Sequence, residues 1–306
     1  MQMVVADAGT HLVFYDNSWD GTVTLREGEE GAGSGHDRAG TSELRMDGGP
    51  LRCWVMVGAP ARVLLAWASL TGAPALPPGW ALGHHHARGV LGDEEEVRRI
   101  VEGHREHGLP LDAVHLGVDH FDARQVFTVD RGAVPQAAGP RGRAAARGDQ
   151  AGVGRGSGGG VVPGTTVYDE GVERDAFVRD ASGAVVEGVG WSGEAVFPDF
   201  THARVRAWWG DLYTERLAQG FAGFWHSMDE PTSFTAFGEP TLPRSARHAL
   251  DGRGGDHREA HNVYGLCMAR RRTRTAGAGP RERPFVFSRS GWPVCSVTAG
   301  RGRARR

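Results

Sequence analysis

The chain has 306 residues, a hydrophobic fraction of 40% and a formal net charge of −2 at pH 7, which suits one large domain or two ordinary ones. The nearly balanced charge gives no electrostatic reason to expect a nucleic acid or an anionic membrane as partner, and no segment approaches the roughly 18 consecutive apolar residues of a membrane-spanning helix. No basic region followed by an apolar run opens the sequence, and the three cysteines have no zinc or redox spacing, so we expect a cytoplasmic protein with reduced thiols.

The first 60 residues have the pattern of β-structure. Short apolar runs at residues 11–15 and 51–57 are bounded by glycine, aspartate and proline, which is typical of strands. A helix is predicted over residues 61–70, before a proline-rich linker at residues 74–79. We therefore divide the chain into a β-rich N-terminal part, residues 1–73, and a second part, residues 79–306.

The second part alternates strand and helix patterns, which indicates β-α-β units and a parallel sheet. Strand patterns occur in residues 80–86, 112–119 and 284–290 and in the apolar run that starts at residue 220. Helix patterns occur in residues 94–107, 203–220 and 256–270.

Residues 136–160 interrupt this alternation. They consist almost entirely of glycine, alanine and arginine, with neither helical nor strand periodicity. Such a segment buries too little apolar area to offset its ordering entropy, so we expect it to be disordered. A barrel enzyme would need its next helix and strand here, and residues 271–283 and the C-terminal tail are similarly aperiodic.

The apolar run at residues 220–226 leads directly into Ser-Met-Asp-Glu-Pro. This segment resembles the signature of glycoside hydrolase family 31, the retaining α-glucosidases and α-xylosidases, which reads Gly-(Ile/Phe)-Trp-x-Asp-Met-Asn-Glu-Pro. The residues that match are Gly223, Phe224, Trp225, Met228, Glu230 and Pro231. Asp229 replaces the family's Asn, and Ser227 stands where the family has its nucleophilic Asp.

Other segments extend the resemblance over most of residues 74–135 and 165–292: residues 116–122, 126–130, 190–193, 196–200 and 287–292. The resemblance implies a (β/α)8 TIM barrel, no cofactor, and an α-linked glucoside or oligosaccharide as partner. With about four convincing barrel strands in the sequence, we expect an incomplete barrel, preceded by a β-rich remnant of a β-sandwich. Such a barrel leaves a sheet edge uncovered, which predicts a marginally stable or aggregation-prone chain.

Retaining glycosidases use two carboxyl groups about 5–5.5 Å apart. The serine hydroxyl at Ser227 carries no charge and needs a neighbouring base, which makes it a poor nucleophile. His226 is adjacent, but consecutive strand residues point to opposite faces. The resemblance also implies that Glu230 tunes the nucleophile electrostatically, and it places the acid/base Asp in a Trp-x-Gly-Asp motif that is absent after Trp292. We therefore expect catalysis to be impaired.

The resemblance further implies that Asp119, Trp191, Trp225, Met228 and Arg289 line the sugar subsite. Each also has a structural interpretation: a carboxylate held by backbone for Asp119, core packing for the tryptophans and an ion pair at a strand end for Arg289. Many family members have an Asp that bonds sugar hydroxyls at the position that is Gly117 in this sequence.

Three consecutive histidines, His84 to His86, allow a metal site, because alternate strand residues share one face. No carboxylate or cysteine lies at a sequence spacing typical of a further metal ligand, so we expect no metal. The arginine clusters at residues 270–274 and 301–306 lack interleaved aromatics and are interpreted as solvated.

Three functional hypotheses follow: an α-glucosidase-type hydrolase with impaired catalysis, a non-catalytic carbohydrate-binding remnant, or a pseudogene product without function. The sequence leaves the sugar and the linkage open. Because each aperiodic segment has the same Gly/Ala/Arg-rich character, we also hypothesise that reading-frame shifts scrambled these segments and ended the chain early. Resequencing the coding DNA tests this.

Overall fold

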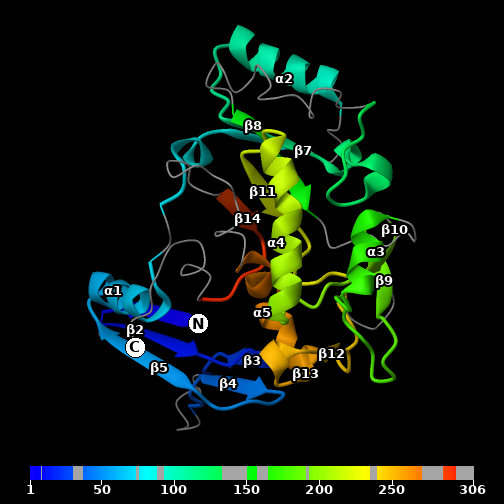
Figure 1. The fold of residues 1–306 in the computed structure, drawn as a ribbon. Coiled ribbons are helices and arrows are strands. Elements are labelled where there is room, and N and C mark those ends of the chain that lie inside the picture. The colour runs from blue at the N-terminus through cyan, green and yellow to red at the C-terminus, as the bar shows by residue number, and fades with distance from the viewer. Residues whose placement is uncertain are drawn as a thin grey trace.

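The computed structural model describes residues 1–7, 9–29, 37–73, 76–87, 93–132, 150–156, 165–190, 193–234, 240–270 and 285–293. Figure 1 shows a β-rich unit formed by the N-terminal strands and a larger α/β unit that continues from it. Among the described residues, no helix combines the length and apolar character that crossing a bilayer requires.

The N-terminal unit contains two small antiparallel sheets. Strands β1 (Gln2–Ala6), β2 (Gly9–Tyr15) and β5 (Cys53–Gly58) form one, in the order β1-β2-β5, and β3 (Gly21–Arg26) pairs with β4 (Thr41–Met46) in the other. Alternate residues of β2 are buried, and Leu12 and Phe14 pack with Val63 of helix α1 (Pro60–Thr71). Proline suits the first turn of α1 because its fixed φ is already helical.

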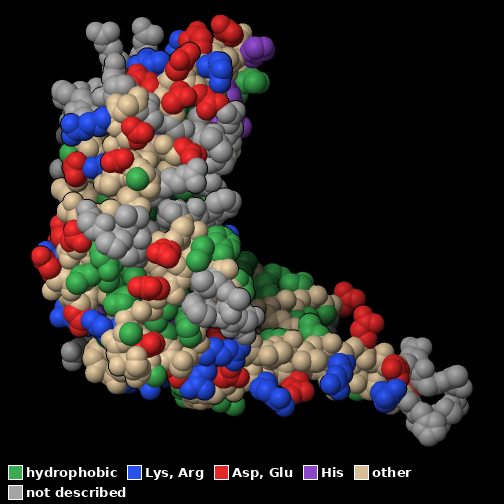
Figure 2. Space-filling view, turned by 90° about the vertical axis from the view of Figure 1, so that its right-hand side faces the viewer, with side chains coloured by type: hydrophobic (Ala, Val, Ile, Leu, Met, Phe, Trp, Pro, Cys, Tyr) green, Lys and Arg blue, Asp and Glu red, His purple; other side chains and the backbone are tan. Residues whose placement is uncertain are grey.

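The N-terminal unit projects from the α/β unit as an arm, and many of its apolar side chains face solvent (Figure 2). Val23 and Leu25 on β3 and Val55 and Val57 on β5 are each more than half exposed. Exposed apolar side chains on these two strands favour association with another surface.

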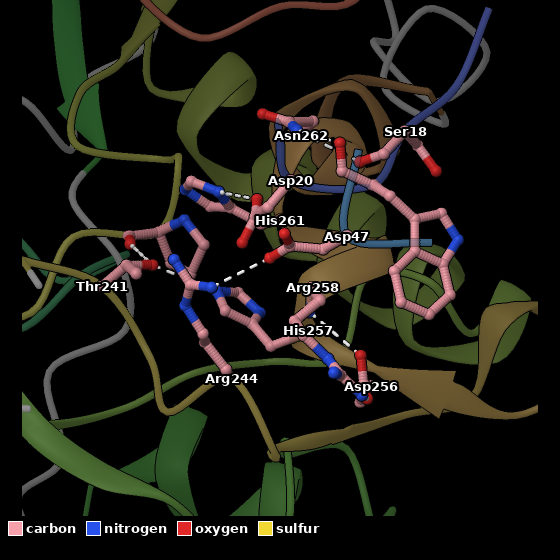
Figure 3. Close-up of polar contacts among 12 residues, drawn as sticks. Ser18, Asp20, Asp47, Thr241, Arg244, Asp256, His257, Arg258, His261 and Asn262 are labelled. Atoms are coloured by element: carbon pink, nitrogen blue, oxygen red, sulfur yellow. Dashed lines mark hydrogen bonds and ion pairs between the residues drawn. The ribbon is translucent and has the colours of Figure 1, made fainter. Parts of the chain in front are cut away.

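A polar interface joins this arm to helix α5 (His257–Ala269) of the larger unit (Figure 3). The backbone N–H of Asp20 donates to the carbonyl of Arg258 at 2.8 Å, and the Asp20 carboxylate lies 3.2 Å from Nδ1 of His261. Asn262 donates to the Ser18 carbonyl at 3.1 Å. The first turns of α5 are therefore held by residues from the opposite end of the sequence.

Five parallel strands form the sheet of the α/β unit, in the order β14-β11-β8-β7-β6. They are β6 (His85–Ala87), β7 (Ala113–Leu116), β8 (Gln150–Gly156), β11 (Gly223–His226) and β14 (Phe285–Ser288). The order in the sheet is the order along the chain, as in a TIM barrel, and the carboxyl ends of all five strands lie at one edge.

Helices occupy the connections between these strands. Helix α2 (Glu94–Glu106) lies between β6 and β7, α3 (Thr166–Glu173) and α4 (Ala203–Ala218) lie between β8 and β11, and α5 lies between β11 and β14. The main core forms where Phe224 of β11 meets Tyr213 and Trp209 of α4 and Tyr264 of α5. Figure 1 shows α4 running alongside β11.

Smaller elements complete the unit. They are the 3-10 turns η1 (Gly79–Leu82), η2 (Val118–His120), η3 (Asp122–Arg124) and η6 (Leu250–Gly252), the hairpin of β9 (Glu187–Gly190) and β10 (Gly193–Val196), and the pair β12 (Arg247–His248) and β13 (Gly255–Asp256). The hairpin packs with Val178, Phe197 and Leu242 in a second hydrophobic cluster.

Two sequence expectations are wrong. Residues 80–86 form the turn η1 and only the start of the short strand β6, because Pro78 and Gly79 favour a turn there. Residues 150–156, expected to be disordered as part of 136–160, form β8 between β7 and β11, so five strands replace the four expected. Backbone hydrogen bonds to both neighbours define this strand, and they need no apolar side chains. Residues 136–149 and 157–160 lie outside the described ranges, and the division at residues 73 and 79 stays a prediction.

Candidate functional site

The residues that resemble the family site follow three strands at the same sheet edge. Asp119 follows β7, Ser227 follows β11 and Arg289 follows β14. His226 pairs in register with Ser288, so the first residues after β11 and β14 lie at one level. Trp191 lies outside the described residues.

The two faces of β11 have different environments. Trp225 contacts His115 of β7 and Phe287 of β14, with ring centroids 5.5 and 5.6 Å away, on the face turned from the helices. His226 points the other way, and its Nε2 lies 3.0 Å from the hydroxyl of Tyr213 on α4. His226 is therefore directed away from the side of Ser227 and cannot serve as its base.

Ser227 lies half-buried just past the end of β11. Within the described residues its hydroxyl makes no hydrogen bond, so no base is poised to activate it. Met228 follows with φ of 62°, a left-handed conformation that is uncommon for a residue with a side chain, and it is also half-buried. The backbone thus turns sharply after Ser227 and presents the next two carboxylates toward β14.

Glu230 forms a two-pronged ion pair with Arg289. The Nε and Nη2 groups of Arg289 donate to the two carboxylate oxygens at 2.6 and 3.1 Å, and Thr232 donates to Glu230 at 3.0 Å. Partial burial works to raise the pKa of Glu230, but the hydrogen bonds and charge of Arg289 outweigh it and lower that pKa. Arg289 is therefore an ion-pair partner at a strand end, and its side chain, 49% exposed, keeps Nη1 without a partner among the described residues.

Asp229 is only 2% exposed and makes a second link between the same two strands. Its Oδ2 accepts a hydrogen bond from Ser288 at 2.8 Å, while its Oδ1 is buried without a partner in the described part of the chain. Burial raises the pKa of Asp229 to about 6, against the lowering effect of the hydrogen bonds from Ser288 and Ser290. Gly265 of α5 permits this arrangement, because a Cβ there would lie 1.9 Å from the Ser290 hydroxyl.

Asp119 occupies the 3-10 turn after β7 and is half-buried, with Gly117 just before the turn. Its neighbour His120 is buried against Phe121 and Phe221. Burial lowers the pKa of His120 to about 4, so the ring is neutral at pH 7 and does not neutralise Asp119. In the sheet order, β8 separates Asp119 from the residues that follow β11.

The rings of the histidine triplet contact other histidines. His85 Nδ1 lies 2.9 Å from His115 Nε2, and the rings of His84 and His86 both contact His104. Among the described residues, no group of three or more His, Cys, Asp or Glu side chains has a geometry that could hold a metal ion.

Residues 227–234, which follow β11, are here called the signature loop. A buried polar hydrogen-bond chain behind this loop was missed by sequence analysis. Asp199 Oδ1 lies 3.1 Å from His248 Nδ1, His248 Nε2 lies 3.0 Å from His257 Nδ1, and His257 Nε2 lies 3.0 Å from Thr241 Oγ1. Thr241 in turn donates to the carbonyl of Pro231 at 2.8 Å. These residues are scattered over residues 199–257 without a common motif, so no sequence signal would have grouped them. The role of Ser288 was missed as well, although the family-like element contains it.

Comparisons with known proteins identify the family of the chain. A family model described as the glycosyl hydrolases family 31 TIM-barrel domain matches residues 74–299. Alpha-glucosidase 2 of Bacillus thermoamyloliquefaciens is 31% identical over 298 residues, which cover 95% of this chain and 36% of that protein. Neutral alpha-glucosidase AB of Homo sapiens is 34% identical over 233 residues, which cover 74% of this chain and 24% of that protein.

The fold also resembles solved structures. The family 31 alpha-glucosidase from Bacteroides thetaiotaomicron matches with a TM-score of 0.75 and 27% identity, over 95% of this chain and 45% of that one. Of the two alpha-glucosidases named above, this chain covers only 36% and 24% of the length.

Proposed function

The chain belongs to glycosyl hydrolase family 31, and on that premise we propose that it derives from a retaining α-glucosidase-type hydrolase whose catalysis is impaired in this sequence. The relatives above are named alpha-glucosidases, which favours α-linked glucosides as the substrate class. The chain corresponds to only part of each relative, so the reaction is inferred from family membership and from the residues at the strand ends.

The observation that carries the impairment is the environment of Ser227. The position needs a charged nucleophile that stabilises an oxocarbenium-like transition state. Its hydroxyl lacks a base, since His226 faces α4 and Glu230 is engaged by Arg289. Glu230 therefore contributes to the ion pair and not to activation of a nucleophile.

Hydrolysis of 4-nitrophenyl α-glucoside and of maltose by the purified chain tests this proposal. We expect no turnover above background for either substrate. Turnover that disappears in Arg289→Ala would refute the proposal, because it would require a working site at this sheet edge.

Restoring the nucleophile distinguishes the effect of the serine at position 227 from the effect of the missing acid/base residue. With Ser227→Asp we expect turnover or a trapped glycosyl-enzyme on α-glucosyl fluoride, because fluoride leaves without a general acid. We expect none on maltose, whose leaving group must be protonated. Ser227→Asn is the matched control, since it has the same shape without the charge. Hydrolysis of maltose by Ser227→Asp would show that an acid/base residue is present.

A carbohydrate-binding remnant is the second candidate. Two observations favour it: Trp225 is half-buried on the face turned from the helices, and Arg289 keeps one donor group open beside the same strand end. Aromatic faces suit sugar C–H surfaces. Calorimetric titration with maltose and isomaltose tests it. Binding that is lost in Trp225→Ala supports a remnant site, and absence of any binding favours a product without function.

The incomplete barrel also belongs to this proposal. In the described part of the chain, β6 and β14 each pair with a single neighbour, which leaves two open edges. We expect self-association that rises with concentration in sedimentation velocity experiments, and a sharp melt of a soluble monomer would contradict it. The cytoplasmic location stays a prediction, which fractionation of the source cells would test.

A further inference from the structure

The buried chain from Asp199 to the carbonyl of Pro231 contains more hydrogen bonds than its neutral side chains can supply. Its four links, Asp199–His248, His248–His257, His257–Thr241 and Thr241–Pro231, are 2.8–3.1 Å long. Each of the four residues is less than a tenth exposed. Water is thus largely kept from these atoms, and they depend on one another for partners.

Each link needs one proton between its two atoms. The Pro231 carbonyl can only accept, so the Thr241 hydroxyl must donate its single proton there. His257 Nε2 must then donate to Thr241, and His257 Nδ1 must accept if the ring is neutral. His248 Nε2 therefore donates to His257. A neutral His248 has no proton left for the link to Asp199. Three protons serve four links, and a fourth is required.

The surroundings place this fourth proton. Asp199 accepts three further hydrogen bonds, from the backbone N–H and hydroxyl of Thr201 and from the backbone N–H of Ala249, as a carboxylate does. Burial works to raise the pKa of Asp199, but the hydrogen bond and charge of His248 and these donors lower it. Burial first and the neighbouring imidazoles second lower the pKa of His257 to about 2, so that ring is neutral. The proton is left for His248.

We propose that His248 and Asp199 form a buried imidazolium–carboxylate pair. The extra proton of this pair sets the direction of every hydrogen bond from Asp199 to Pro231 and so positions the Pro231 carbonyl at the base of the signature loop. Pro231 follows Asp229 and Glu230 directly, so these hydrogen bonds fix the backbone that carries the two carboxylates linked to β14. The inference is independent of the proposed function, because it concerns protons within the fold.

Other titratable groups face the chain from α5 and from the N-terminal arm. Tyr264 packs edge-on against His248 and donates to a backbone carbonyl, and burial raises its pKa well above the usual value, so it stays neutral. His261 lies 5.2 Å from His257, ring to ring, and is bonded to Asp20 (Figure 3). Its hydrogen bond to Asp20 directs the proton of His261 toward the arm and away from His257.

Long-range 15N–1H correlation spectra of the 15N-labelled chain test the proton count directly. At pH 7 we expect one buried histidine, assigned to His248 through its loss in His248→Gln, with protons on both ring nitrogens. His257 should carry its proton on Nε2. A singly protonated His248 at pH 7, or a proton on Nδ1 of His257, would overturn the proposal without any variant.

Thr241→Val and Thr241→Ser form a matched pair of variants. Valine has the shape of threonine without the hydroxyl, so it removes the last two links, and two neutral rings then satisfy the remaining two. At pH 7 we expect the second ring proton of His248 to be absent from Thr241→Val, because a neutral hydrogen-bond chain then satisfies every remaining link. Serine keeps the hydroxyl, and Thr241→Ser should show the same ring protons as the parent. Identical ring protonation of His248 in the two variants would refute the link between the hydroxyl and the proton.

The loop provides the second readout. Amide hydrogen exchange at Thr232 and Ser233 should be faster in Thr241→Val than in Thr241→Ser at the same pH. Equal exchange in the two variants would show that the hydrogen-bond chain does not position the loop.

Discussion

Replacing Asp229 with asparagine is expected to stabilise the fold at neutral and alkaline pH. The carboxyl is 2% exposed, its Oδ1 lacks a partner within the described structure, and its pKa is raised from 3.8 to about 6, chiefly by burial. A difference of about 2 pKa units corresponds to ~3 kcal/mol of folding free energy. Asparagine removes the charge and keeps an oxygen that can accept from Ser288. It is also the residue of the family pattern at this position.

The direction of the pH dependence follows from the raised pKa. The folded chain holds the Asp229 proton more tightly than the unfolded chain, so its contribution to stability is complete below pH 3.8 and is lost as the pH rises through about 6. The asparagine variant does not titrate there. The two proteins should therefore differ little near pH 3.5 and by up to ~3 kcal/mol at pH 8.

Urea unfolding followed by tryptophan fluorescence at pH 4 to 8 measures this difference. Asp211→Asn, on the exposed side of α4, is the control for removing a carboxylate and should change the unfolding free energy little at any pH. The reasoning is refuted if Asp229→Asn is no more stable than the parent at pH 8, or if its gain is as large at pH 4 as at pH 8.

Three further substitutions test the contacts around the site, the first of them with a control substitution in α2. Gly265→Ala should destabilise the fold by about 1–3 kcal/mol, because the added Cβ would lie 1.9 Å from the Ser290 hydroxyl. Gly103→Ala is the control and should stabilise α2 by about 0.5–1 kcal/mol, because its Cβ would have nothing within 4 Å. Thermal melts of the two variants measure both effects. Arg289→Ala should cost about 0.5–1 kcal/mol in urea unfolding at pH 7, given its solvent screening. Because the pKa of Glu230 is lowered, that cost should fade below pH 4.5 as this carboxylate is protonated, and a loss that persists at pH 3 contradicts the ion-pair explanation. Tyr213→Phe should cost about 1–3 kcal/mol by urea unfolding, since two buried ring nitrogens lose its hydroxyl, and an unchanged midpoint would contradict this.

Sequence patterns predicted α1, α2, α4 and α5 and the edge that carries the site, but not α3. Helices α2 and α5 begin within a residue of the predicted positions because Asp93 and Asp256 cap them through backbone N–H groups, which is a local signal. The apolar run before Ser227 forms β11 as predicted, and parallel pairing brings the predicted strand ends to one edge.

Non-local interactions account for what sequence reasoning missed. Strand β8 has no apolar pattern and is defined by pairing with β7 and β11, which are far away in sequence. The link between Asp229 and Ser288 joins residues 59 positions apart, and the chain from Asp199 to Pro231 depends on burial that no local pattern encodes. These contacts come from tertiary packing, which overrides local preference.

The docking of the N-terminal arm on α5 has a consequence for recombination between family members. Asp20 and Ser18 hold the first turns of α5, while Gly265, farther along the same helix, touches the loop that follows β11. A chimera that joins a foreign barrel at the proline-rich linker would separate this helix from its anchor and loosen the strand ends behind it. Exchange of barrels among relatives should therefore transfer residues 18–20 together with α5.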